Sequence, residues 1–171
     1  SASYCVGGLV GRADGSNVSI KCGWFAGSVT NTATGDERGT GGLVGSAYGT
    51  VLLQDCLNEG TVDVTTSTKD VPKAGGLVGD VAASATLTFT DCLTIGDVLT
   101  ASGKLAGYFV GCYDNSQLIS NTSYGYGNSR VVGYRNNSGA KFKINYILNG
   151  SSGSSDRDGG NYYTHKVTLV S

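Results

Sequence analysis

The sequence predicts an all-β fold, a three-sided parallel β-helix of about four to five coils that ends in a region of capping strands. Three observations predict it. The chain has 28 glycines among 171 residues, and glycine costs about 1 kcal/mol relative to alanine at each helical position. Apolar residues make up 39 % and charged residues 15 %, which suits a packed core with many turns. The third observation is an internal repeat. Right-handed coiling is expected from the general rule for parallel crossovers.

Each repeat begins with a glycine motif, Gly-Gly-Leu-Val-Gly. The motif occurs unchanged at Gly7, Gly41 and Gly75, and a looser copy is Gly107-Tyr108-Phe109-Val110-Gly111, so the copies start 34, 34 and 32 residues apart. Such glycines predict sharp corners, which need either φ > 0 or a backbone without a Cβ in its way. The glycines of the unchanged copies are Gly7, Gly8, Gly11, Gly41, Gly42, Gly45, Gly75, Gly76 and Gly79.

A second segment follows each glycine motif after a short polar link. It covers Ile20–Val29, Leu53–Val62 and Phe89–Val98, and these three copies align without gaps. A fourth copy starts in register as Ile119-Ser120-Asn121-Thr122 and then loses the pattern. The two segments together predict three short strands per repeat: the Leu-Val pair, the stretch that ends at Ile20 or its equivalent, and the stretch centred on Val29 or its equivalent.

One repeat has too few apolar side chains to fold alone, because ordering its backbone costs about 1–2 kcal/mol per residue. Coils stacked at about 4.8 Å bring equivalent positions into columns and bury them together. Three apolar columns are expected: Ile20, Leu53, Phe89 and Ile119; Val18, Val51 and Leu87; Val29, Val62 and Val98.

The chain divides into residues 1–128, the repeats, and residues 129–171, a degenerate coil with C-terminal capping strands. Val131–Gly133 resembles the end of the glycine motif. Ser151–Gly160 has the composition of an exposed loop, and Tyr162–Val170 that of a closing strand. Tyrosines gather in this last third, where they could cover the end of the stack or stack on sugar rings.

The glycine motif and the Asp-Cys segment that ends in Gly-x-Val resemble the GLUG motif family over residues 7–128. Members of this family recur in large bacterial surface proteins, including adhesins and the non-catalytic region of certain IgA-cleaving metallopeptidases. The Asn-Cys that is usual in the family is replaced by Asp55-Cys56 and Asp91-Cys92 in the second and third copies, by Cys22-Gly23 in the first and by Asn121-Thr122 in the fourth. The resemblance implies a repeat architecture at a cell surface and brings no catalytic residues with it.

Two pairs of side chains are expected on neighbouring coils. Asp55 and Asp91 would lie about 5 Å apart, where two carboxylates repel. Either each caps its turn through a side-chain oxygen, which the sequence favours, or a calcium ion lies between them. Cys56 and Cys92 stack in the same way, as buried thiols or as a disulfide. The five cysteines are an odd number, so one at least lacks a partner in the chain.

Catalytic, metal and cofactor sites are not predicted. His165 is the only histidine and has no nucleophile motif beside it, and there is no Cys-x-x-Cys, histidine pair or phosphate-binding loop. A net charge of −1 gives no basic surface for nucleic acid, and the apolar runs are too short to cross a membrane. N-glycosylation sequons occur at Asn17, Asn121, Asn136 and Asn149.

The sequence therefore predicts a non-enzymatic, extracellular structural or adhesive module that belongs to a larger surface protein. The chain starts at Ser1 without a signal peptide, so it is expected to be a processed or excised piece. In a sharper version, the last coil of one subunit stacks on the first coil of another and builds a filament. The expected partners are a further copy of the chain, a larger surface protein, or host or matrix glycans. The alternative is a β-helix that binds or degrades polysaccharide, and degradation would need converging carboxylates.

Overall fold

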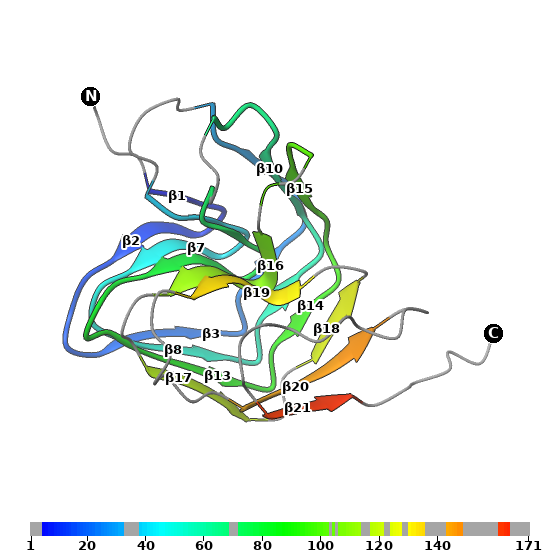
Figure 1. Ribbon diagram of the computed structural model, residues 1–171. Helices are drawn as coiled ribbons and strands as arrows, with labels where there is room; N and C mark the ends of the chain where they lie inside the picture. Colours follow the sequence, from blue (N-terminus) through cyan, green and yellow to red (C-terminus); the bar gives the residue numbers. More distant parts are fainter. Residues whose placement is uncertain are drawn as a thin grey trace.

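The structure is a computed structural model in which the regular elements of the described residues are all β-strands. The described strands pair in parallel and in register, so the prediction of an all-β parallel stack is confirmed, and the arrangement is consistent with a parallel β-helix or solenoid-like fold (Figure 1). The structure describes residues 5–32, 38–68, 72–102, 104 and 106–113, and beyond these the backbone of strands at 117–121, 124–127, 130–135, 143–148 and 161–164.

In the described residues, each of the first three repeats forms one coil of five strands, so the expectation of three strands per repeat was wrong. The glycine motif divides the first strand in two, and two residues of the second segment make a short strand of their own. Coil 1 contains β1 (Val6–Gly7), β2 (Val10–Ala13), β3 (Val18–Lys21), β4 (Trp24–Phe25) and β5 (Ser28–Thr30). Coil 2 contains β6 (Thr40–Gly41), β7 (Val44–Ala47), β8 (Thr50–Gln54), β9 (Leu57–Asn58) and β10 (Thr61–Val64). Coil 3 contains β11 (Ala74–Gly75), β12 (Val78–Val81), β13 (Thr86–Thr90), β14 (Leu93–Thr94) and β15 (Val98–Thr100).

Six further strands continue the stack: β16 (Ala106–Tyr113), β17 (Gln117–Asn121), β18 (Tyr124–Gly127), β19 (Arg130–Arg135), β20 (Lys143–Leu148) and β21 (Asn161–Thr164). Strand β19 pairs with β16 so that Val132 lies opposite Val110, the place that the end of a fifth glycine motif would take. Strand β21 overlaps the start of the expected closing strand. The rest of that strand and the Ser151–Gly160 loop lie outside the described residues.

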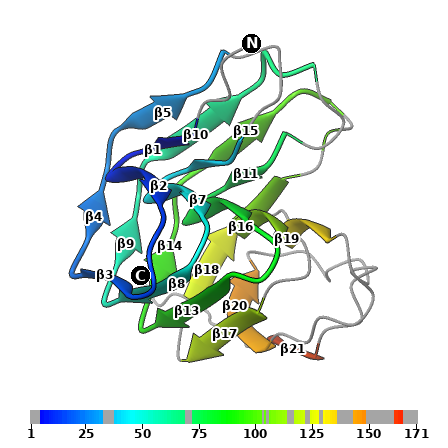
Figure 2. The ribbon, with the colours of Figure 1, turned by 90° about the vertical axis from the view of Figure 1, so that its left-hand side faces the viewer.

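The described strands form four parallel sheets, and equivalent strands of successive coils lie side by side (Figures 1 and 2). Three sheets have the orders β15-β10-β5, β17-β13-β8-β3 and β21-β20-β18-β14-β9-β4. The largest sheet has two branches, β1-β6-β11 and β2-β7-β12, which join through β16 and also include β19.

Two of the three expected columns are confirmed in full. Val51 lies opposite Val18 and Leu87, and Val62 lies opposite Val29 and Val98. The column of Ile20, Leu53 and Phe89 is also confirmed, but its expected fourth member is wrong, because Phe89 lies opposite Ser120.

The second segment of the fourth repeat is displaced by one residue from the expected alignment, whereas its glycine motif keeps the expected register. Ile119 lies opposite Thr88, Leu118 lies opposite Leu87, and Asn121 lies opposite Thr90 rather than at the Asp91 position. A strand offers two registers that differ by one residue and exchange its faces. Because Leu118 and Ile119 supply an apolar residue for either register, the hydrophobic pattern could not choose between them.

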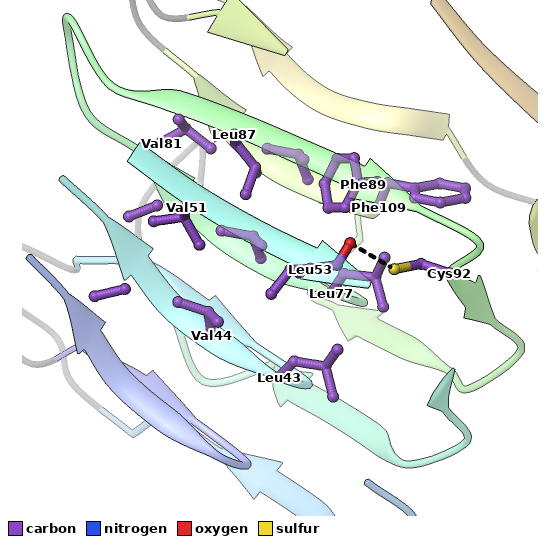
Figure 3. Packing of buried hydrophobic residues seen from close by; sticks show 14 of the residues in the cluster. Leu43, Val44, Val51, Leu53, Leu77, Val81, Leu87, Phe89, Cys92 and Phe109 are labelled. Carbon is purple, nitrogen blue, oxygen red and sulfur yellow. Dashed lines mark hydrogen bonds between the residues drawn. The ribbon is translucent and has the colours of Figure 1, made fainter. Parts of the chain in front are cut away.

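Among the side chains that the structure describes, the buried apolar ones form two clusters. The larger cluster fills the space between β7 and β12 on one side and β8 and β13 on the other (Figure 3). Within it the rings of Phe89 and Phe109 meet edge to face, with centroids 5.8 Å apart. The smaller cluster contains Val62, Val64, Ala74 and Ala106, with Val98 packed against it.

The glycine motif folds each coil back on itself and brings two layers of backbone into contact. Strand β1 lies against β2 and β7 (Figure 1). A Cβ added to Gly45 on β7 would come within 2.6 Å of the Val6 nitrogen, and one on Gly79 would collide with the backbone of Thr40. No described motif glycine has a positive φ. Of the two expected reasons for glycine, the close approach of backbone is therefore the one that the structure bears out.

The fourth glycine motif carries Tyr108 in place of the second glycine. It lies within one eight-residue strand, β16, which pairs with β11 at Gly107 and with β12 at Val110, so it keeps the register of the other copies. Against β19 its register is irregular between these two residues.

Candidate interaction surfaces

The expected carboxylate column lies on the turn that follows β3, β8 and β13. Cys22, Asp55 and Asp91 occupy equivalent places there, with φ of 53°, 52° and 50°. Asp is one of the few residue types that enter this left-handed region readily. Both carboxylates are exposed. Neither makes a side-chain hydrogen bond within the described residues, so what the two aspartates supply is the backbone conformation rather than the expected cap.

Metal binding finds little support at this turn. Calcium takes six to eight oxygen ligands, and the turn offers two exposed carboxylates on neighbouring coils. Among the residues that the structure describes, no group of three or more His, Cys, Asp or Glu side chains could hold a metal ion.

The Cys56 and Cys92 side chains are buried thiols that link neighbouring coils. The Cys56 Sγ donates to the Ile20 carbonyl at 3.4 Å, and the Cys92 Sγ donates to the Leu53 carbonyl at 3.3 Å (Figure 3). Burial raises the pKa of the Cys92 thiol from 9.0 to about 11. A thiol with this pKa stays protonated at neutral pH and is a poor nucleophile, which suits a structural role.

The remaining candidate residues are scattered. Asn17 is exposed in the link before β3. Asn121 is the last residue of β17, and only its backbone is described. Asn136, Asn149 and His165 lie outside the described residues.

An outward row of large side chains, which the sequence analysis did not single out, crosses coils 1 to 3. Trp24 lies opposite Leu57, which lies opposite Leu93. Trp24 is 65 % exposed and Leu93 is 36 % exposed. Ile95, exposed to 42 %, and the exposed Glu59 adjoin the row. We call Trp24, Leu57, Glu59, Leu93 and Ile95 the Trp24 face.

The Trp24 face has polar contacts above and below its apolar row. On the surface, the Trp24 Nε1 donates to the Glu59 carboxylate of the next coil at 2.7 Å. Beneath it, the Asn58 and Thr94 side chains are fully buried and hydrogen-bonded, with the Asn58 Nδ2 3.4 Å from the Thr94 Oγ1. The Asn58 Oδ1 also accepts from the Gly60 nitrogen at 3.1 Å. These bonds hold the short strands under the face in place. The alternation of Trp24 with Phe25, and of Leu57 with Asn58, is the sequence signal that could have revealed this face.

Coil 1 presents a second surface at the end of the stack. In each of the four sheets a strand of coil 1 is an edge strand. Leu9 is 44 % exposed, whereas the equivalent Leu43 and Leu77 are fully buried. Val18 and Ile20 are half-buried, whereas the equivalent residues of coil 2 are fully buried. We call this surface, formed by Leu9, Val18, Ile20 and the free edges of β1 to β5, the open face of coil 1.

The outer side of the β7 and β12 branch is, by contrast, closed by its own loops. The Lys73 Nζ forms an ion pair with the Asp80 carboxylate at 3.0 Å, and Asp80 is only 5 % exposed. The Gly39 nitrogen donates to the Ser46 Oγ at 2.9 Å. This side therefore offers less apolar surface than the Trp24 face or the open face of coil 1.

These features define the described part of the chain as a stack of parallel β-coils that exposes apolar side chains on the Trp24 face and on the open face of coil 1. No protein-family model, curated protein or solved structure matches it. Within the described part, no helix has the length and apolar character that crossing a membrane requires.

Proposed function

We propose that the chain is a non-enzymatic structural and adhesive module of an extracellular or cell-surface protein. In this proposal it is a GLUG-like, right-handed β-helix of about four to five coils, capped by residues 129–171, with the four sheets of the described strands in place of the expected three sides. The observation that carries the adhesive part is the Trp24 face, where a large aromatic side chain is 65 % exposed at the head of an apolar row.

The geometry of the Trp24 face supports contact with glycans. Successive rungs of a parallel sheet are about 4.8 Å apart, which is close to the length of one sugar residue in an extended chain. The C–H face of a sugar ring stacks on an indole, and its hydroxyl groups donate to a carboxylate such as Glu59. A glycan would therefore lie across the strands, along the direction in which the coils stack, with one sugar near each rung.

A fluorescence titration tests this proposal directly, because Trp24 is the only tryptophan of the chain. Hexasaccharides of β-linked glucose, N-acetylglucosamine and xylose would be added while the Trp24 emission is followed. We expect a saturable blue shift with at least one of them and loss of calorimetric binding in the Trp24→Ala variant.

A matched control keeps the result specific. Leu99 is 42 % exposed on β15, which belongs to another sheet, so Leu99→Ala should bind like the unmodified chain. Absence of any emission change across this panel and a set of matrix polysaccharides would refute glycan adhesion. Release of reducing ends from the same sugars would instead favour the alternative of a polysaccharide-degrading β-helix.

A further inference from the structure

We propose that the Trp24 face prefers one chemical class of glycan, a β-linked chain of glucosamine whose free amines are positively charged. This inference rests on the glycan adhesion proposed above and names the class of sugar that the face binds best. The exposed apolar row supplies a stacking surface that any sugar ring can use. The choice among sugars therefore depends on the charges that border this row.

The charged residues of the second segment are all acidic in coils 2 and 3. They are Asp55 and Glu59 in coil 2, and Asp91 and Asp97 in coil 3. All four side chains are exposed, and the ion pairs of the described residues lie elsewhere. The second segment of coil 1 contains Lys21 instead, on β3. Uncompensated negative charge is thus concentrated over coils 2 and 3.

These carboxylates lie on both sides of the apolar row and within it. Asp55 and Asp91 occupy equivalent places on the turn that precedes β9 and β14, so their backbones are about 4.8 Å apart along the stack. Asp97 lies on the other side, at the corner between β14 and β15. Glu59 lies between these borders and accepts from the Trp24 Nε1 at 2.7 Å. A carboxylate accepts several hydrogen bonds, so Glu59 keeps the capacity to accept from a ligand as well.

A positively charged sugar complements this surface better than a neutral or an acidic one. Neighbouring carboxylates repel one another, and a neutral sugar leaves that repulsion in place. A uronic acid adds a further negative charge, whereas an ammonium group lowers the repulsion and donates charge-assisted hydrogen bonds. The face of an indole such as Trp24 also attracts a cation. The charges of the face therefore favour amines over hydroxyl or carboxylate groups.

A glucosamine chain presents its amines in an arrangement that matches the two borders. In an extended β-linked chain successive sugars are turned over, so their amines project alternately to the two sides. With one sugar near each rung, the amines reach the turn of Asp55 and Asp91 on one side and the corner of Asp97 on the other. A basic peptide fits less well, because an extended peptide pairs with a free sheet edge and β9 and β14 are interior strands.

Fluorescence titrations that follow Trp24 can compare three hexasaccharides, those of glucosamine, N-acetylglucosamine and glucose. The buffer is weakly acidic, so that the amines are protonated, and low in salt. N-acetylglucosamine is the matched ligand, because acetylation removes the charge and keeps the ring and its linkage. We expect the glucosamine hexamer to bind about tenfold tighter, because each exposed charge pair contributes modestly and several act together. At about 0.5 M salt the difference should fall to about twofold or less.

Paired variants assign this difference to the border. Asp55→Asn combined with Asp91→Asn removes two charges, and asparagine suits the left-handed φ of 52° and 50° at these positions. The affinity for the glucosamine hexamer should fall about fivefold, toward that for the acetylated hexamer. The matched control, Asp14→Asn combined with Asp63→Asn, removes the same charge outside the second segments and should keep the tenfold difference. Asp14 lies in the link before β3, and Asp63 lies on β10.

Three results would overturn the assignment to amino sugars. They are equal affinity for the glucosamine and N-acetylglucosamine hexamers, a difference that persists in the Asp55 and Asp91 double variant, and equally tight binding of a lysine hexapeptide. If the N-acetylglucosamine hexamer still binds in those cases and Trp24→Ala abolishes its binding, glycan adhesion stands and only the preference for amines fails. Absence of binding by all three hexasaccharides would contradict the adhesive function itself.

Discussion

Replacing Gly45 by alanine is the most informative single change in this chain. A Cβ at Gly45 would come within 2.6 Å of the Val6 nitrogen and 2.8 Å of the Val6 oxygen, and would collide with the Gly11 carbonyl. All three atoms belong to the backbone of coil 1, so no side chain can rotate away. Overpacking of a core costs about 1–3 kcal/mol where side chains can adjust. Because two backbone layers must separate here, we expect Gly45→Ala to cost about 3 kcal/mol or more.

The matched control is Gly15→Ala. A Cβ there meets only the Val18 Cγ2, at 3.4 Å, which is an ordinary contact. Both changes remove the same freedom from the unfolded chain, worth about 0.4–1 kcal/mol in favour of the folded state. Urea unfolding followed by circular dichroism should show Gly15→Ala at or above the stability of the unmodified chain. A loss of about 3 kcal/mol lowers the melting temperature of Gly45→Ala by about 6–12 °C. Equal stability of the two variants would refute the two-layer contact.

Three further changes test the core, the left-handed turn and the buried thiol. Phe89→Ala empties a fully buried site and should lower the free energy of unfolding by about 3–5 kcal/mol, whereas Leu93→Ala, on the surface, should lower it by less than about 1 kcal/mol in the same urea titration. Asp91→Gly should be neutral or stabilising, because φ is 50° there; a clear loss on thermal unfolding would mean that the carboxylate caps the turn. The Cys92 pKa of about 11 lies above its usual 9.0, so the buried thiol stabilises the fold fully below pH 9 and loses that contribution as the pH rises toward 11. Between pH 8 and 10 the free energy of unfolding of the unmodified chain should fall by about 1 kcal/mol more than that of Cys92→Ser, because serine does not titrate in this range. If the two free energies of unfolding depend on pH in the same way, the raised pKa of Cys92 is contradicted.

The columns of the core could be predicted from the sequence because identical spacing brings identical positions together. The repeat spacing and the alternation of side chains along a strand are enough to predict one column of Val18, Val51 and Leu87. The fourth repeat could not be aligned in the same way. Its two adjacent apolar residues, Leu118 and Ile119, fit either register, so the hydrophobic pattern does not decide which of them faces the core.

The sequence pattern did not predict that the glycine motif folds each coil back on itself. A corner and a contact between two backbone layers both require glycine, so the motif alone does not separate them. In the structure the Val6 backbone lies so close to Gly45 that the close approach of two backbone layers is the reason for glycine there. The capping role expected of Asp55 and Asp91 fails for a related reason, since aspartate is suited both to capping and to a left-handed φ.

The Trp24 face was predictable in principle from the second segment. Trp24, Leu57 and Leu93 each precede an inward residue, and strict alternation places them outside. Two features hid them. The strands concerned are only two residues long, and large apolar residues are usually assigned to the core.

The in-register stacking of coils can be tested most directly by nuclear Overhauser effects between methyl groups of specifically labelled valine and leucine. The fold predicts contacts from Val51 to both Val18 and Leu87, and from Val62 to both Val29 and Val98. These contacts join residues about 33–36 positions apart in the chain, as parallel rungs require. Methyl groups that contact only neighbours within their own repeat, or partners displaced by one residue, would contradict the stack.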